Sequence, residues 1–259
     1  MDLQLKDKKV FISGSTKGIG LAIAKLLVAE GAKVIINGRS RASVDKALAE
    51  IRGEYSSAEI DGMVCDFAKP DEIEDLIAGI AEVDVLINNV GVFGNKDFMD
   101  ITDEDWKRFY EINVLSGVRL SRAFLPGMLE RDWGRIIFIS SESALNIPVE
   151  MIHYGMTKTA QLAVSRGLAE TTKGSNVTVN SILPGPTFSE GVKEMTSGND
   201  KNRKEIEKEF FKEARPSSII QRFADPKEAA NMVAYVASPL SSATNGASLR
   251  VDGGVVKHI

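Results

Sequence analysis

The stretch HYGMTK at residues 153–158 contains a tyrosine and a lysine four positions apart. Residues i and i+4 of an α-helix lie on one face, so Tyr154 and Lys158 would point the same way. A phenol has an ordinary pKa near ~10, and lowering that pKa to ~7 takes roughly 4 kcal/mol. One ammonium about 4 Å away supplies a similar energy at an effective dielectric constant near 20, before desolvation is subtracted. The spacing therefore predicts an acid–base pair, although exposed helix pairs have the same spacing.

A second candidate is the glycine-rich stretch SGSTKGIG at residues 13–20, which follows a β-branched run and precedes a helical pattern. Glycines at 14, 18 and 20 allow a tight turn and a close approach of backbone to ligand, and a helix N-terminus offers free N–H groups to a phosphate. The alternative is a tight turn with glycine caps. Because the lysine of a P-loop is absent from the required position, the pattern favours a dinucleotide over a nucleoside triphosphate.

The stretch NGRS at residues 37–40 bears on which dinucleotide is bound. A cofactor with a free ribose 2′-hydroxyl requires a carboxylate near the end of the second strand. Asn37 and Gly38 stand there instead, and Arg39 offers paired donors to a 2′-phosphate, with Lys17 as a second cation. We therefore expect NADP(H) rather than NAD(H); the alternative is that Arg39 is a solvated loop residue.

The elements that must position these residues are short, nearly continuous apolar runs that alternate with helical patterns. Such runs are typical of strands covered on both faces. Their alternation with helices predicts right-handed βαβ units. The expected fold class is α/β, a doubly wound parallel sheet (Rossmann fold) in three layers, with residues 1–259 forming one domain. The seven runs lie at 9–13, 33–37, 62–66, 83–88, 135–140, 177–183 and 247–251.

Residues 186–218 depart from this alternation, because strand signals stop there and a charged helix is expected over 199–214. Ile206, Phe210 and Ala214 recur every four positions, and Phe211 widens this apolar stripe. Such a helix suits a substrate lid over a pocket, and it equally suits a subunit contact.

Composition and charge narrow the class of partner. The 259 residues carry a formal net charge of -4, with both signs interleaved, which indicates neither a nucleic acid nor an anionic membrane as partner. Cys65 is the single cysteine, so no internal disulfide forms, and with His153 and His258 it cannot supply the usual zinc ligand set. The N-terminus lacks an apolar signal core, and no run of 18 apolar residues occurs. We expect a metal-free cytoplasmic protein that acts on a small molecule.

Taken in order along nearly the whole chain, these motifs resemble those of the short-chain dehydrogenase/reductase family. NNVG at residues 88–91 has Val90 where the family has alanine, and PGPT at residues 184–187 is similar to the segment that meets the nicotinamide amide. The resemblance implies a homo-oligomer, dimer or tetramer, that binds a nicotinamide dinucleotide. The cofactor-binding residues it implies are Gly14, Ser15, Thr16, Lys17, Gly18, Ile19, Gly20, Arg39, Ser40, Asp66, Phe67, Asn89, Val90, Gly91, Tyr154, Lys158, Pro184, Gly185 and Thr187.

The resemblance also implies catalytic roles. Tyr154 would be the general acid or base, and Lys158 would lower the tyrosine's pKa and hold the nicotinamide ribose. Ser141 would orient the substrate oxygen, and Asn113 would hold a water that links Lys158 to solvent.

Four neighbouring assignments have alternatives. Ser140 could face the site in place of Ser141, but the alternation of strand residues favours Ser141. Asn113 could be a satisfied mid-helix amide. His153 is adjacent to Tyr154 and does not share its helix face, which predicts a substrate-pocket or surface residue. Glu142 lies where it could line the pocket, and the sequence assigns it no role.

The expected function is an NADPH-dependent oxidoreductase that transfers hydride to a ketone or aldehyde carbonyl. A 3-oxoacyl thioester is the specific substrate considered, because the glycine loop and NGR resemble those of 3-oxoacyl acyl-carrier-protein reductases. One alternative is an NAD(P)-dependent alcohol, sugar or hydroxysteroid dehydrogenase. Another is an NADP(H)-sensing protein without turnover, against which the complete set of Asn113, Ser141, Tyr154 and Lys158 argues.

Overall fold

The computed structural model describes residues 1–189 and 203–259. Its seven strands form one sheet in the order β3-β2-β1-β4-β5-β6-β7, and every neighbouring pair is parallel. The predicted doubly wound sheet is confirmed, and each of the seven apolar runs forms a strand. The strands are β1 (Lys9–Ile12), β2 (Lys33–Gly38), β3 (Ile60–Val64), β4 (Val85–Asn88), β5 (Gly134–Ile139), β6 (Val177–Pro184) and β7 (Ser248–Val251).

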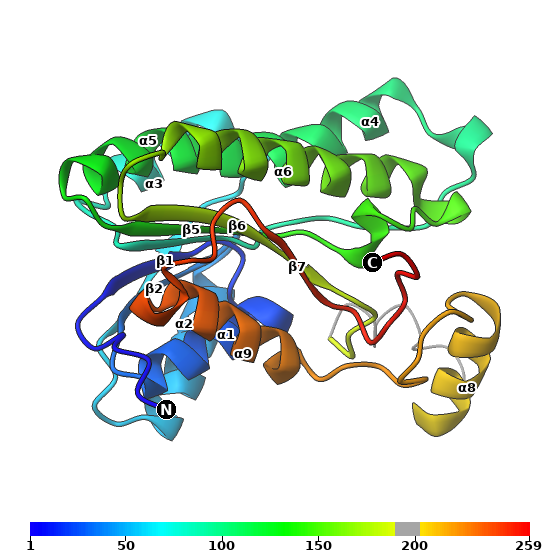
Figure 1. The fold of residues 1–259 in the computed structure, drawn as a ribbon, viewed down its shortest axis with the longest axis horizontal. Helices are drawn as coiled ribbons and strands as arrows, with labels where there is room; N and C mark the ends of the chain where they lie inside the picture. The colour runs from blue at the N-terminus through cyan, green and yellow to red at the C-terminus, as the bar shows by residue number, and fades with distance from the viewer. Residues whose placement is uncertain (190–202) are drawn as a thin grey trace.

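Helices cover both faces of the sheet, as Figure 1 shows, with α1, α2 and α9 on one side and α3, α4, α5 and α6 on the other. Local sequence sets several helix starts. Thr102 and Asp105 form a capping box at the first turn of α4, and Asp225 forms one with Glu228 at α9. The helices are α1 (Gly18–Ala29), α2 (Arg41–Glu54), α3 (Pro70–Ala78), α4 (Asp103–Tyr110), α5 (Ser116–Glu130), α6 (Ile152–Thr171), α8 (Arg203–Glu213) and α9 (Pro226–Ala237), with short 3₁₀ turns η1 (Phe98–Asp100), η3 (Glu142–Ala144), η4 (Val149–Met151) and η5 (Pro239–Ser241).

Two apolar clusters hold the three layers together, one on each face of the sheet. On one face Ile23 of α1 and Val233 of α9 pack against the strands, and on the other Leu120 of α5 packs with Phe11 and Phe138. All five side chains are almost completely buried. Burial of each such side chain contributes about 1.5–3 kcal/mol, which fixes the strand ends relative to one another.

Between α4 and α5 the helix makes one π-helical turn, η2 (Glu111–Leu115), with Asn113 at its centre. Single π turns inside helices commonly occur at functional sites, because the wider turn redirects a side chain. The periodicity of the sequence predicted an ordinary helix here, since an apolar stripe does not reveal one added residue.

Helix α8 lies apart from both helical layers (Figure 1). The first residues of the helix expected over 199–214 fall outside the described residues. Phe211 is fully buried, and its ring centroid lies 5.3 Å from that of Phe223 and 5.1 Å from that of Phe210. The chain itself therefore covers part of the predicted apolar stripe, whereas Ala214 is exposed.

Candidate active site

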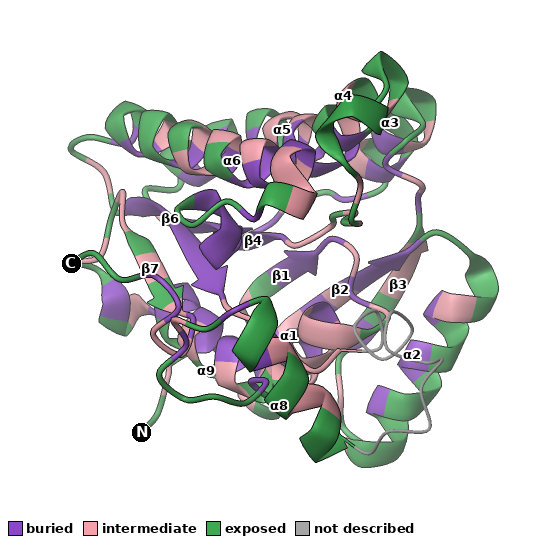
Figure 2. Ribbon diagram, turned by 90° about the vertical axis from the view of Figure 1, so that its right-hand side faces the viewer, coloured by how far each residue is buried: buried purple, intermediate pink, exposed green. Residues whose placement is uncertain are grey.

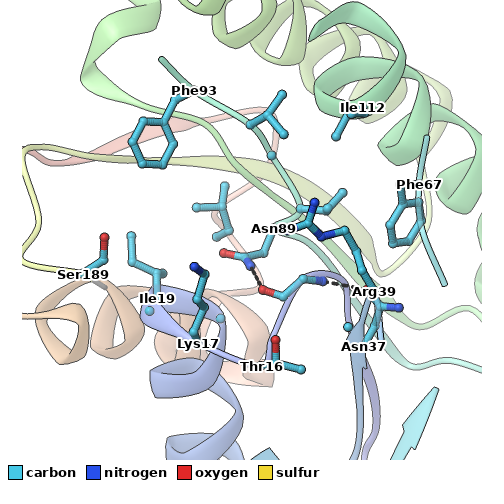
Figure 3. A pocket seen from close by; sticks show the side chains of 18 of the residues that line it. Thr16, Lys17, Ile19, Asn37, Arg39, Phe67, Asn89, Phe93, Ile112 and Ser189 are labelled. Carbon is cyan, nitrogen blue, oxygen red and sulfur yellow. Dashed lines mark hydrogen bonds between the residues drawn. The ribbon is translucent and has the colours of Figure 1, made fainter. Parts of the chain in front are cut away.

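A cavity of about 750 Å³ opens at the carboxyl ends of the strands, where β1 lies between β2 and β4. Strand order reverses at this point, which is the place where open α/β sheets bind ligands. Figure 2 shows the strands of the sheet between the two helical layers, and Figure 3 shows the lining of the cavity at close range. The predicted site residues that line the cavity are Gly14, Thr16, Lys17, Gly18, Ile19, Gly20, Arg39, Asp66, Phe67, Asn89, Val90, Gly91, Tyr154 and Lys158.

The glycine loop is shaped so that side chains would obstruct it. Gly14 has φ +61°, and a Cβ there would lie 3.0 Å from the Cα of Val90. A Cβ on Gly20 would lie 2.6 Å from the main-chain oxygen of Gly14. Gly18, the first residue of α1, has φ +60°. The N-terminus of α1 therefore opens into the cavity, and its free N–H groups and helix dipole fit a pyrophosphate.

Asn37 and Arg39 have different roles at the end of β2. The buried Asn37 amide accepts a hydrogen bond from the Gly14 N–H at 3.0 Å and donates to the Met63 main-chain oxygen at 3.2 Å. Asn37 thus fastens the glycine loop to β3. Arg39 is exposed and lines the cavity, as does Lys17 (Figure 3), so two cations stand at this end of it.

Five predicted cofactor residues do not line this cavity. Ser15 is buried, and its hydroxyl donates to the main-chain oxygen of Ile12 at 2.7 Å. Ser40 caps α2 by accepting from the Ser43 N–H at 3.3 Å. The others lie at the end of β6 and in the loop after it, which passes so close to the end of β7 that a Cβ on Gly185 would be 2.6 Å from the main-chain oxygen of Asp252. These remaining residues are Pro184, Gly185 and Thr187.

Tyr154 and Lys158 lie on α6, with the lysine Nζ 5.6 Å from the centroid of the tyrosine ring. Lys158 Nζ donates to the main-chain oxygen of Ile139 at 2.9 Å and to Gln161 Oε1 at 3.3 Å. Burial lowers the pKa of Lys158 to about 7 and raises the pKa of Tyr154 above its ordinary value. The expected lowering of the tyrosine's pKa by the lysine is therefore not found: desolvation of the phenol is the largest influence, and the charged groups that act on this pKa are Glu142 and Arg215.

Ser141 rather than Ser140 faces the tyrosine. Ser141 is a side-chain hydrogen-bond partner of Tyr154, and its Oγ donates to Glu142 Oε2 at 2.6 Å. The Ser140 hydroxyl donates instead to the main-chain oxygen of Lys158 at 2.9 Å, although Ser140, unlike Ser141, is among the residues that line the cavity. The alternation of strand residues predicted this difference.

The Asn113 side chain is fully engaged by protein groups. Its Oδ1 accepts from the Val92 N–H at 2.7 Å, and its Nδ2 donates to the Val92 oxygen and to Thr157 Oγ1, both at 2.9 Å. Its main-chain oxygen accepts from Gln161 Nε2 at 2.6 Å. Asn113 thus connects the loop after β4 to α6. This agrees with the alternative prediction, in which Asn113 is an amide satisfied by protein groups.

His153 is neither in the cavity lining nor at the surface, so the expectation for it was wrong. It is buried against α4, with its ring centroid 4.1 Å from that of Phe109 and 6.2 Å from that of Trp106. Burial lowers the pKa of His153. Adjacent helix residues do not share a face, and this correctly separated His153 from Tyr154. The spacing could not show that α4 packs against the face on which His153 lies.

Several lining residues were missed by the sequence reasoning. Phe93 stands edge-on to Tyr154, with ring centroids 6.3 Å apart. Val92, Phe93 and Gly94 directly follow NNVG, which is a signal that could have found them. Arg108 and Ile112, from α4 and η2, have no such signal because only the fold brings them to the cavity. The other missed residues in the lining are Gly38, Cys65, Ile139 and Ser189, together with Asn37 and Ser140 described above.

Within residues 1–189 and 203–259, no group of three or more His, Cys, Asp and Glu side chains is placed to hold a metal ion. No helix in those same ranges is both long enough and apolar enough to cross a membrane.

A phosphate-binding glycine loop, a switch-point cavity and a Tyr–Lys pair beside it define an oxidoreductase site of the dinucleotide-binding α/β class. The family model described as Enoyl-(Acyl carrier protein) reductase matches residues 14–256. The chain belongs to the short-chain dehydrogenase/reductase family and is an oxidoreductase of that family.

Two relatives extend over almost all of the chain. An uncharacterized oxidoreductase of Bacillus subtilis, YvaG, is 46% identical over 100% of both chains. Dehydrogenase/reductase SDR family member 4 of Bos taurus is 33% identical, covering 98% of this chain and 89% of that protein.

Solved structures show the same fold. L-sorbose reductase from Gluconobacter frateurii, complexed with NADPH and L-sorbose, has a TM-score of 0.91 and 30% identity over 100% of both chains. Actinorhodin polyketide ketoreductase with NADPH has a TM-score of 0.88 and 30% identity over 97% and 98% of the two chains. A 7α-hydroxysteroid dehydrogenase with NADH has a TM-score of 0.87 and 29% identity over 99% and 97%.

Proposed function

We propose that this protein is an NADPH-dependent reductase of a ketone or aldehyde carbonyl. The observation that carries the proposal is that Tyr154 and Lys158 line the same cavity as the glycine loop and Arg39. A bound dinucleotide with its phosphates on the glycine loop would extend along this cavity toward Tyr154. Ser141 is the hydrogen-bond partner of that tyrosine.

Each part of the cofactor has residues suited to hold it. The N-terminus of α1 and the glycine loop receive the pyrophosphate. Arg39 and Lys17 receive the 2′-phosphate that distinguishes NADP(H), since a guanidinium binds phosphate through paired donors. Lys158 would hold the nicotinamide ribose, as the family resemblance implies. The cofactor, when bound, supplies the hydride.

Tyr154 is suited to supply the proton. Because its pKa is raised by burial, it carries its proton at neutral pH, which is the form that reduction of a carbonyl requires. The phenol gives this proton to the carbonyl oxygen and takes one back when an alcohol is oxidised. Lys158 places a cation near the phenolate that forms, which lowers the cost of that charge.

Three substrate classes are the first to test. The polyketide ketoreductase similarity and the glycine loop support a 3-oxoacyl thioester. The match to L-sorbose reductase over the full length of both chains supports a sugar, and the hydroxysteroid dehydrogenase similarity supports a steroid worked oxidatively. We assign α8 and its flanking residues, within 186–218, to a lid that selects among them.

The test is the initial rate of NADPH oxidation against ketones, sugars, oxosteroids and 3-oxoacyl thioesters, with wild type and Tyr154→Phe compared. We expect one class to be turned over and the variant to lose about 10²- to 10⁴-fold in kcat. Tyr235→Phe, at an exposed tyrosine on α9, is the matched control and should keep its rate. Tight NADPH binding without turnover on every substrate would replace this proposal with a sensor.

We further propose that the protein is cytoplasmic and works as a dimer or tetramer, as its family resemblance implies. Light scattering of the purified protein measures the number of chains, and a monomeric mass would contradict the assignment.

A further inference from the structure

A buried ion pair lies directly behind the catalytic serine. Arg215 Nε is 3.1 Å from Glu142 Oε1, and the two side chains are 8% and 5% exposed. In every other ion pair that the structure describes, at least one partner is more than 10% exposed. Removing two charges from water costs several kcal/mol per ion, and such a pair is often no more stabilising than apolar residues. Its position beside Ser141 therefore calls for another explanation.

The second carboxylate oxygen of Glu142 accepts the Ser141 hydroxyl at 2.6 Å. A serine hydroxyl has one proton and two lone pairs. The proton is committed to Glu142, and one lone pair accepts the Ser143 N–H at 3.1 Å. The remaining lone pair can only accept, so a hydrogen bond between Ser141 and the Tyr154 hydroxyl has the tyrosine as its donor.

We propose that Glu142 and Arg215 are positioning residues: Glu142 takes the proton of Ser141 in a hydrogen bond, so that this hydroxyl can only accept from Tyr154, and Arg215 holds the Glu142 carboxylate in place. This inference rests on the proposed reductase function, in which the protonated phenol is the reactive form. Neither residue needs to touch the substrate. Both act through Ser141, and Arg215 does so although it lies 61 residues after Tyr154 in the chain.

Arg215 also connects this arrangement to the α8 segment. It follows α8 by two residues, and its Nη1 donates to the main-chain oxygen of Ala214 at 2.7 Å. The same Nη1 lies 3.6 Å from Glu150 Oε1, whose side chain is 35% exposed. The end of the proposed lid is therefore tied to the hydroxyl that orients the catalytic tyrosine.

The charges around Tyr154 give the two residues opposite effects. The nearby groups are Glu142 on η3, Arg215 after α8, and Lys158 on α6, with Glu150 beyond the arginine. The carboxylate of Glu142 raises the pKa of Tyr154, and the guanidinium of Arg215 lowers it. Removing Glu142's charge should also release the Ser141 proton, which then turns toward the phenolate and stabilises it.

The experiment follows Tyr154 itself rather than turnover. The four tyrosines are labelled with ¹³C at Cζ, and the Tyr154 resonance is assigned by its loss in Tyr154→Phe. The resonance is followed from neutral pH upward while circular dichroism reports an intact fold. We expect Glu142→Gln to move the onset of ionisation to lower pH by about one unit, and Arg215→Met to move it to higher pH. Arg215→Lys should restore the wild-type onset.

Glu150→Gln is the matched control, because it removes a carboxylate beside the same arginine without touching Ser141. It should leave the onset unchanged, and a shift as large as that of Glu142→Gln would overturn the proposal. Shifts of both single variants in one direction would also overturn it. If a single variant does not fold, the double variant Glu142→Gln/Arg215→Met replaces it, since removing both charges leaves no unpaired ion. This double variant should bring the onset of Tyr154 ionisation to within a few tenths of a pH unit of the wild-type onset only if the two effects oppose.

Failure of the reductase assignment would appear separately, as wild type without turnover on the carbonyl panel. The Tyr154 resonance still reports on Ser141 in that case, so the two results are distinguishable.

Discussion

The ammonium of Lys158 donates a hydrogen bond to the side-chain oxygen of Gln161, across 3.3 Å and one turn further along α6. Gln161 Nε2 donates in turn to the main-chain oxygen of Asn113 at 2.6 Å. All three residues are buried. Because the other acceptor of Lys158, the Ile139 oxygen, is also neutral, no carboxylate offsets the burial of the ammonium, and the pKa of Lys158 falls to about 7.

Replacing Gln161 should therefore move the pH at which the enzyme loses activity. Gln161→Leu removes one acceptor from the ammonium, so the pKa of Lys158 falls further and the alkaline limb of kcat/KM moves to lower pH by roughly half to one unit. Gln161→Glu supplies a charged partner and should move that limb to higher pH. A pH–rate profile of each variant measures this, and identical profiles for all three proteins would mean that Gln161 only fills space.

Lys158 should also make the stability of the folded protein depend on pH. Its pKa is lowered on folding from 10.5 to about 7, so between these values the unfolded chain binds more protons than the folded one. Stability then rises with pH across that window, and below about pH 7 the folded protein bears the full cost of the buried charge. Lys158→Met removes this cost.

We expect Lys158→Met to be more stable than wild type by roughly 5 kcal/mol at or below neutral pH, with the gain shrinking toward pH 10.5. Urea unfolding at several pH values measures the difference. A constant difference across the range would show that the gain comes from packing rather than from proton binding. The exposed Lys46→Met, on α2, is the control and should show no such window.

Arg39 should decide between the two nicotinamide cofactors. Arg39→Asp removes the guanidinium that faces a 2′-phosphate and adds a repulsive charge, so the KM for NADPH should rise by about 10- to 100-fold while the KM for NADH falls or is unchanged. Steady-state rates with each cofactor measure this ratio. Arg41→Asp is the control, because Arg41 is exposed, pairs with Asp45 at 3.8 Å and does not line the cavity. An unchanged preference in Arg39→Asp would remove the 2′-phosphate assignment.

The half-buried Phe210 separates the two roles considered for α8. Its ring centroid lies 4.9 Å from that of Phe223, which anchors the helix to its own chain. If α8 is a lid, Phe210→Ala loosens this contact and raises the substrate KM by roughly 3- to 10-fold, with the KM for NADPH unchanged. Light scattering is run alongside, and a changed mass with an unchanged substrate KM would assign α8 to a subunit interface. Phe211→Ala is the less useful variant, since a fully buried phenylalanine costs about 3–5 kcal/mol to remove.

The local sequence pattern was sufficient to predict the strands, the glycines of the first loop and the pair of side chains on one helix face. Continuous apolar runs are typical of strands in a covered parallel sheet, so all seven strands were found, although the edge strands β3 and β7 are partly exposed and β3 begins at Ile60 rather than at residue 62. Gly14 and Gly18 were found because a left-handed backbone favours glycine, and Tyr154 and Lys158 because i and i+4 share a helix face.

Tertiary structure alone decided which groups surround these side chains. Arg215 is 73 residues from Glu142 in sequence, and their contact depends on where the chain returns after β6. His153 is buried because α4 packs on it, and Lys158 faces Gln161 and Ile139 rather than a carboxylate. Periodicity reports the face on which a residue lies. It does not report the dielectric and charges that the rest of the fold brings to that face, and these set the pKa values of Tyr154 and Lys158.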